Sequence, residues 1–110
     1  MKTIALLAAA AATAAAYSTE TCPATEYGKL APLALNPNLK TCQTASGWQM
    51  IPPTGYPTPA QLAIMCKTSA CFKLIDAIKA LNPSDCELVF GNVSLNVKNM
   101  TDNFADSCFN

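Results

Sequence analysis

Six cysteines constrain the fold more than any other feature of this 110-residue chain. An even number of cysteines in a short exported chain predicts three disulfides. A structural zinc site would instead need four ligands, usually in two closely spaced pairs, and the chain has no histidine. Only Cys66 and Cys71 form a close pair, and no C-x-x-C redox motif occurs. The pattern therefore favours disulfides over a metal or redox site for Cys22, Cys42, Cys66, Cys71, Cys86 and Cys108.

The N-terminal stretch MKTIALLAAAAATAAA predicts export. It joins one positive charge, Lys2, to an apolar run and a small-residue cleavage pattern that ends at Ala16. The run is shorter than the about 20 apolar residues of a transmembrane helix. We therefore predict a signal peptide over residues 1–16 and a single extracellular domain over residues 17–110, with no integral membrane segment in the mature chain.

Charge and composition exclude several classes of function. Without Lys2 the domain has six lysines, seven acidic side chains and no arginine, so it lacks the basic face that a nucleic-acid partner requires. Without histidine it also lacks the usual general base, and its carboxylates occupy positions typical of solvated surfaces or turns. We therefore expect no catalytic residue, no metal, no cofactor and no enzymatic activity. A lipid hydrolase that works without histidine is kept as an alternative.

Proline, glycine and capping residues divide the domain into short elements. Residues 22–42 carry apolar side chains at roughly helical spacing, and Pro32 should split or kink any helix there. Residues 43–56 mix glycine and proline with apolar side chains, which favours an omega-type loop folded over the core. Thr58 and Gln61, with a proline between them, form a capping box for the helix that follows.

The C-terminal half gives clearer periodicity. Residues 69–81 have an apolar stripe at amphipathic helical spacing, and residues 97–108 have a second one. Residues 87–95 contain two β-prone runs around Gly91-Asn92, which predicts a hairpin. The predicted fold class is therefore all-α, with five to six short helices, one small two-stranded β-hairpin and an omega-type loop.

Two triplets match the acceptor motif for N-linked glycosylation. They begin at Asn92 and Asn99, followed two residues later by Ser94 and Thr101. Both are possible glycosylation sites in an exported chain. The domain is also rich in methionine and aromatic residues, which suit either a packed core or an adaptable pocket. Composition leaves these two interpretations open.

The cysteine order and several stretches resemble the elicitins, small secreted helical proteins of oomycetes. The stretches are SGWQM, PAQLAIMCKTSAC, LNPSDCEL and LNV, and the resemblance extends from Cys22 to Cys108. It implies a family that binds sterols and related lipids and can trigger plant defence, including the hypersensitive response. It also implies a disulfide pattern of Cys22–Cys86, Cys42–Cys71 and Cys66–Cys108.

The same resemblance implies a lipid pocket built from the loop, the two central helices, the hairpin and the last helix. Its lining would comprise Trp48, Met50, Ile51, Tyr56, Leu62, Met65, Leu74, Ile78, Phe90, Leu95, Val97 and Met100. Trp48, Leu62 and Met100 stand where sterol-binding members have tyrosine. Leucine cannot hydrogen-bond a sterol hydroxyl and methionine accepts only weakly, so ligand preference is expected to differ from that of standard elicitins.

Two functional hypotheses remain at this point. The first is a secreted monomer that holds a sterol, fatty acid or similar apolar ligand without covalent chemistry and is recognised at a plant cell-surface receptor. The second is a filled-core interaction module that acts on a host or microbial receptor and carries no lipid. An enclosed apolar cavity would distinguish them.

Overall fold

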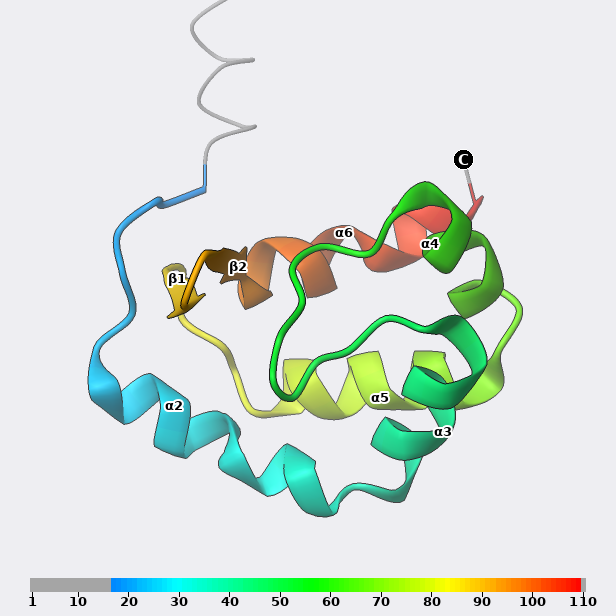
Figure 1. Cartoon of the computed structure of the whole chain (residues 1–110), viewed down its shortest axis with the longest axis horizontal. Coiled ribbons are helices and arrows are strands. Elements are labelled where there is room, and N and C mark those ends of the chain that lie inside the picture. The colour runs from blue at the N-terminus through cyan, green and yellow to red at the C-terminus, as the bar shows by residue number, and fades with distance from the viewer. Residues whose placement is uncertain (1–16, 110) are drawn as a thin grey trace, which may run out of the picture.

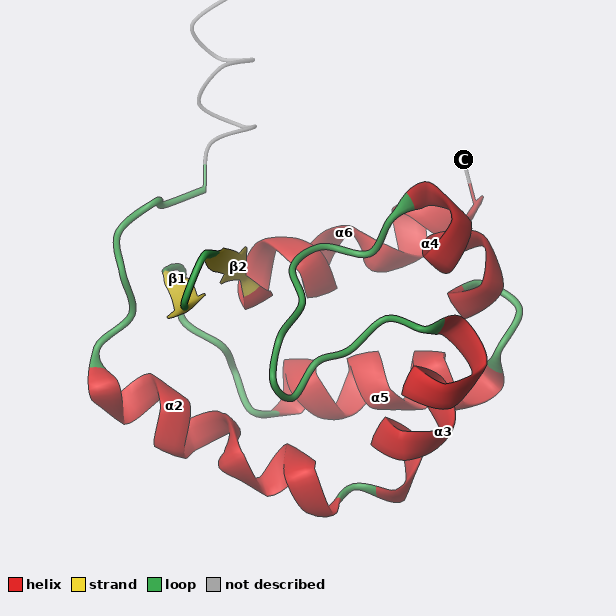
Figure 2. Ribbon diagram, viewed as in Figure 1, coloured by secondary structure: helices red, strands yellow, loops and turns green. Residues whose placement is uncertain are grey.

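The computed structural model describes residues 17–109, which form five α-helices, one 3-10 helix and one two-stranded antiparallel sheet (Figures 1 and 2). The elements in chain order are α2 (Ala24–Leu30), η1 (Ala31–Leu35), α3 (Pro37–Ser46), α4 (Pro59–Met65), α5 (Ser69–Ala80), β1 (Glu87–Phe90), β2 (Val93–Asn96) and α6 (Val97–Phe109). The mainly helical fold class with one hairpin is confirmed. The predicted signal peptide lies outside the described residues.

Proline placement explains the first three elements. Pro32 cannot continue α2, and the chain tightens after Leu30 into η1. Asn36 then takes an extended conformation and caps α3, because its side chain accepts a hydrogen bond from the backbone N–H of Asn38 at 2.8 Å. The predicted break at Pro32 is confirmed, and Asn36 is both the C-cap of η1 and the N-cap of α3.

The loop begins later than the sequence suggested. Residues 43–46, expected in the loop, form the last turn of α3. Gly47 ends this helix with φ 81°, a left-handed conformation that glycine adopts without steric cost. The segment from Gly47 to Pro57 then folds over the core, where Trp48 is fully buried and donates from its Nε1 to the carbonyl oxygen of Gly55 at 2.8 Å.

The two central helices follow their sequence signals. Thr58 and Gln61 form the predicted capping box, in which the Thr58 hydroxyl accepts from the Gln61 backbone at 3.1 Å and the Gln61 side chain accepts from the Thr58 backbone at 3.0 Å. In α5, Leu74, Ile75 and Ile78 are buried on the predicted stripe. The core lies where α3 packs on α5 and α5 packs on α6.

The hairpin and the last helix form one continuous unit. β1 and β2 pair antiparallel with Leu88 opposite Leu95, and Gly91 makes the turn with φ 59°. Asn96 ends β2 and caps α6, since its Oδ1 accepts from the backbone N–H of Asn99 at 2.9 Å. Figure 1 shows the hairpin at one end of the molecule and α4 at the other.

Three disulfides tie these elements together. Cys42–Cys71 joins α3 to α5, Cys66–Cys108 joins the end of α4 to α6, and Cys22–Cys86 joins the segment before α2 to the segment before β1. Their Cα–Cα distances are 4.8, 5.3 and 4.9 Å respectively, within the normal range for a disulfide. The pairing implied by the elicitin resemblance is confirmed.

Within residues 17–108, each buried side-chain nitrogen or oxygen has a hydrogen-bond partner. In the same range no helix has the length and apolar character needed to cross a membrane.

Candidate functional site

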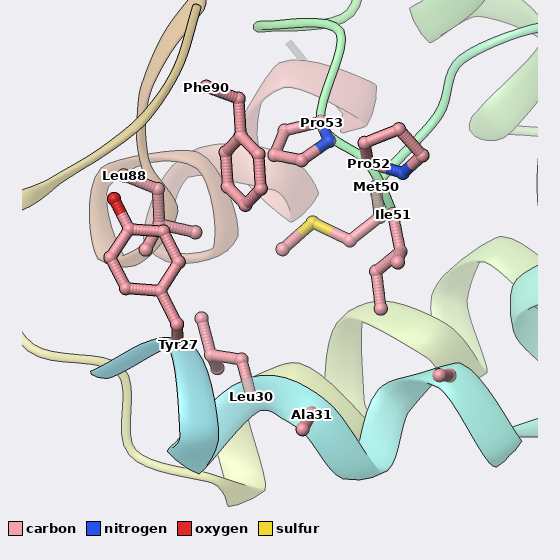
Figure 3. Close-up of a pocket in the computed structure, with 10 residues that line it drawn as sticks. Tyr27, Leu30, Ala31, Met50, Ile51, Pro52, Pro53, Leu88 and Phe90 are labelled. Carbon is pink, nitrogen blue, oxygen red and sulfur yellow. The ribbon is translucent and has the colours of Figure 1, made fainter. Parts of the chain in front are cut away.

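An apolar cavity of about 330 Å³, open to solvent on one side and not enclosed, lies between α2–η1, the loop and the hairpin (Figure 3). We call it the helix–hairpin cavity. Its lining residues are Tyr27, Leu30, Ala31, Ala34, Met50, Ile51, Pro52, Pro53, Leu88 and Phe90. In Figure 3 the loop residues face Leu88 and Phe90 across the open space, and the thioether of Met50 extends into it. The Tyr27 hydroxyl is the only polar side-chain group of this lining.

Local structure explains why α2 and η1 leave room here. Tyr27, Leu30, Ala31 and Ala34 follow the i, i+3, i+4, i+7 spacing of one helical face. Ala31 and Ala34 lie within η1, where residues three apart align on the same side of the helix. This side therefore presents two methyl groups to the cavity where longer side chains would fill it.

The loop wall is held by a side chain from α3. The Gln43 Oε1 accepts hydrogen bonds from the backbone N–H groups of Met50 and Ile51, at 2.8 and 3.3 Å. Thr54 closes the following turn, because its backbone N–H donates to the carbonyl oxygen of Gln49 at 3.2 Å. These contacts fix the position of Met50 and Ile51 relative to the core.

The hairpin wall is tied to α2 by Tyr27. Its hydroxyl donates to the Val89 carbonyl oxygen at 3.2 Å and accepts from the Val89 backbone N–H at 3.0 Å. The Tyr27 ring also contacts Phe90 with a centroid separation of 5.4 Å and a tilt of 58°. Because the hydroxyl proton is already donated, no side chain of the lining has a hydrogen-bond donor left for a ligand.

A buried carboxylate holds the other side of α2. Glu26 is 4 % exposed, accepts from the Ser84 backbone at 2.8 Å and pairs with Lys29 at 3.0 Å. Lys29 also donates to the Asn82 carbonyl oxygen at 2.9 Å. Burial alone would raise the pKa of Glu26, but the hydrogen bonds from Ser84 and Lys29 outweigh it and lower the pKa. This cluster and the Cys22–Cys86 disulfide secure α2 to the segment between α5 and β1.

The structure separates the predicted pocket residues into three groups. Met50, Ile51 and Phe90 line the helix–hairpin cavity. Tyr56, Leu62 and Met100 line a second cavity of about 160 Å³ beside α6, together with Pro57, Asn103, Phe104 and Ser107. The other six are buried in the core and line neither of these cavities: Trp48, Met65, Leu74, Ile78, Leu95 and Val97.

Sequence reasoning missed most of the lining of the larger cavity. The missed residues are Tyr27, Leu30, Ala31, Ala34, Pro52, Pro53 and Leu88. The helical spacing in residues 22–42 is the available signal: its apolar stripe comprises Tyr27, Leu30, Leu33 and Leu35, and only Tyr27 and Leu30 line the cavity. Of these, Leu33 faces the core at 2 % exposure and Leu35 points into solvent at 89 % exposure.

The described residues show no cluster of three or more histidine, cysteine or acidic side chains that could hold a metal ion. What the fold and its cavity define is a class: a small helical protein, closed by three disulfides, with an apolar cavity between α2–η1, a loop and a hairpin. Residues 21–108 match the family model for elicitins. The chain therefore belongs to the elicitin family.

Relatives of known sequence and structure agree. The chain is 40% identical to elicitin-like protein 1 of Pythium oligandrum in an alignment 116 positions long, which covers 97% of this chain and 68% of that protein. It is 34% identical to the beta-elicitin cryptogein of Phytophthora cryptogea over 115 residues, 98% of each chain. The crystal structure of sylvaticin, described as a new secreted protein from Pythium sylvaticum, superposes with a TM-score of 0.82 at 64% identity. That match covers 86% of this chain and all of the sylvaticin chain.

Proposed function

We propose that this elicitin is exported and binds an apolar lipid in the helix–hairpin cavity. The observation that carries the proposal is the cavity itself, about 330 Å³ in volume and apolar apart from one tyrosine hydroxyl. Ligand pockets in proteins span roughly 300–1,000 Å³, so this volume lies at the lower end of that range. Removal of hydrocarbon from water would supply the affinity, and no reaction chemistry is required.

The lining favours the hydrocarbon part of a ligand over its polar end. An apolar cavity of about 150 Å³ is enough to bind benzene, so about twice that volume suits one segment of a fatty acyl chain or of a sterol ring system. Because Tyr27 has already donated its proton to Val89, a ligand hydroxyl or carboxylate gains no donor from the lining side chains. We therefore infer that the polar end stays in solvent beside Phe90, which is 39 % exposed.

A cavity-filling substitution tests the proposal. Ala34→Phe would place a ring in the helix–hairpin cavity, whereas the matched Ala45→Phe would place one on an exposed site of α3 that lines neither cavity. Both variants and the wild type would be stripped of lipid and titrated with a fluorescent sterol and a fluorescent fatty acid. We expect saturable binding by the wild type and Ala45→Phe, and at least about tenfold weaker binding by Ala34→Phe, or about 1.4 kcal/mol.

If wild type, Ala34→Phe and Ala45→Phe bind the probes with equal affinity, the ligand does not occupy the helix–hairpin cavity. If a folded wild type shows no saturable binding of either probe, the proposal of lipid binding is refuted. Native mass spectrometry of freshly purified protein provides a second readout, because a carrier should retain lipid from its source. Export is tested separately by expressing the full chain in a eukaryotic host and looking for it in the medium.

The filled-core interaction module remains the second candidate, and one observation favours it. Six of the residues expected to line a pocket, including Trp48, Met65 and Leu74, are packed in the core and line neither described cavity. Under this hypothesis a receptor on a plant or microbial surface recognises the exterior of the fold. A folded protein that binds neither lipid probe but still acts on plant cells would support it.

A further inference from the structure

The two glycosylation motifs occupy very different environments in the structure. Asn92 lies in the turn between β1 and β2, directly after Gly91 with its φ of 59°. Both residues that define the motif, Asn92 and Ser94, are exposed. In Figure 1 this turn lies at the hairpin end of the molecule. A sugar attached here would extend from a hairpin turn into solvent.

Asn99 lies instead in the first turn of α6, with its amide held on both sides. Its Nδ2 donates to the Tyr56 hydroxyl at 3.3 Å, and its Oδ1 accepts from the Asn103 side chain at 2.8 Å. Thr101, the third residue of that motif, is 2 % exposed and its hydroxyl donates to the Lys98 carbonyl oxygen at 3.3 Å. A glycan on Asn99 would replace one of the two Nδ2 protons beside the Tyr56 hydroxyl, so the sugar would crowd the Tyr56 side chain.

We propose that Asn92 carries an N-linked glycan in the exported protein and that Asn99 stays unmodified. The inference rests on the export proposed above, because only chains that enter the secretory pathway meet the donor. The step joins Nδ2 of Asn92 to the anomeric carbon of a lipid-linked oligosaccharide pyrophosphate. The bond from that carbon to the pyrophosphate breaks, and Nδ2 loses one proton.

The position of this glycan has a physical consequence for the surface around it. Val89 and Phe90, at the end of β1, are 38 % and 39 % exposed and are apolar. A bulky hydrophilic chain on Asn92, two residues from Phe90, would lie close to these apolar side chains and raise the solubility of the protein. It would also stand at the rim of the helix–hairpin cavity, since Phe90 lines that cavity.

The test is an intact-mass measurement on protein secreted by a eukaryotic host. The full chain would be expressed with its own leader and, in parallel, with residues 1–16 replaced by a leader of the host. Glycosylation is judged on the protein exported by the host leader. If the chain's own leader does not direct export, only the first arm fails, and the glycosylation result is unaffected. Masses would be compared before and after treatment with an enzyme that removes N-linked glycans.

Three variants locate the modification: Asn92→Gln, Ser94→Ala and Asn99→Gln. Ser94 is exposed, so Ser94→Ala removes the motif without touching the core and serves as a check on Asn92→Gln. We expect the wild type and Asn99→Gln to lose glycan mass on treatment, and Asn92→Gln and Ser94→Ala to have the unmodified mass throughout. An unmodified wild type, or glycan at Asn99 alone or in addition to Asn92, would overturn the proposal.

Discussion

Substitution of Asn96 tests whether one buried amide joins the hairpin to the last helix and the N-terminal segment. The Asn96 side chain is almost fully buried, with the residue 1 % exposed. Its Oδ1 caps α6 through the Asn99 backbone, and its Nδ2 donates to the Ser18 carbonyl oxygen at 3.1 Å and to the Asp85 carboxylate at 2.8 Å. One side chain therefore joins the start of α6 to the segment before β1 and to the N-terminal segment around Ser18.

The expected cost of Asn96→Ala follows from these contacts. Loss of an N-cap costs about 0.5–2 kcal/mol, and loss of the hydrogen bond to Ser18 adds about 0.5–1.5 kcal/mol. The exposed Asp85 carboxylate regains water, so its bond is left out of the sum. The free energy of unfolding should fall by about 1–3.5 kcal/mol. Asn96→Ser keeps an oxygen that can cap α6 and should be more stable than Asn96→Ala by about 0.5–2 kcal/mol.

Urea unfolding followed by circular dichroism at pH 7, with the disulfides intact, measures these differences. Asn103→Ala is the matched control, because Asn103 is an exposed asparagine of α6 whose two hydrogen bonds to Asn99 lie at the surface, so its loss should change stability by no more than about 0.5 kcal/mol. The slope of free energy against urea should stay constant across the set. If Asn96→Ala unfolds like Asn103→Ala, or if Asn96→Ser is no better than Asn96→Ala, the capping argument is wrong.

Acid should weaken the fold, because the pKa of Glu26 and that of Asp85 are lowered below their ordinary values of 4.5 and 3.8. Each ionised carboxylate stabilises the fold fully at pH values above its ordinary pKa, and this stabilisation is lost as the pH falls through the lower pKa of the folded state. In thermal unfolding the wild type should be more stable than Glu26→Gln at pH 7, and this difference should shrink below about pH 4. A difference that stays constant with pH would contradict this. Replacement of Cys22 and Cys86 by alanine should lower the free energy of unfolding by up to about 4 kcal/mol, since it opens a loop with a sequence separation of 64. The same variant should bind lipid more weakly because α2 loses its covalent tie, and unchanged affinity in the fluorescence titration would show that the disulfide does not shape the cavity.

Local signals predicted the elements that local interactions create. The capping box at Thr58, the amphipathic stripe of α5 and the turn at Gly91 each involve residues within a few positions of one another, and all three form as expected. The last turn of α3 was missed for the opposite reason. Only Leu39, Cys42 and Ser46 of that helix are buried, so its apolar pattern is weak, and the Cys42–Cys71 disulfide and packing on α5 hold it in place.

The disulfide pairing shows what resemblance adds to residue chemistry. Six cysteines permit fifteen pairings, and spacing alone left them open. The order of cysteines within stretches similar to elicitins selected one pairing, and the structure contains it. Resemblance succeeded here because a covalent framework determines which elements lie next to one another. It does not determine how closely their side chains pack.

The cavity depends on how closely the side chains of neighbouring elements pack, and this is why the sequence predicted only part of its lining. Leu88 and Leu95 are directly opposite one another in the hairpin and both are buried, yet only Leu88 lines the helix–hairpin cavity. No periodicity distinguishes two such residues, because residues directly opposite one another in an antiparallel pair lie on the same face of the sheet. The lining implied by the elicitin resemblance consists of large apolar and aromatic residues, but in a close-packed fold large side chains fill space. The space remains where Ala31 and Ala34 face the loop and the hairpin, so short side chains within an apolar stripe were the more informative signal.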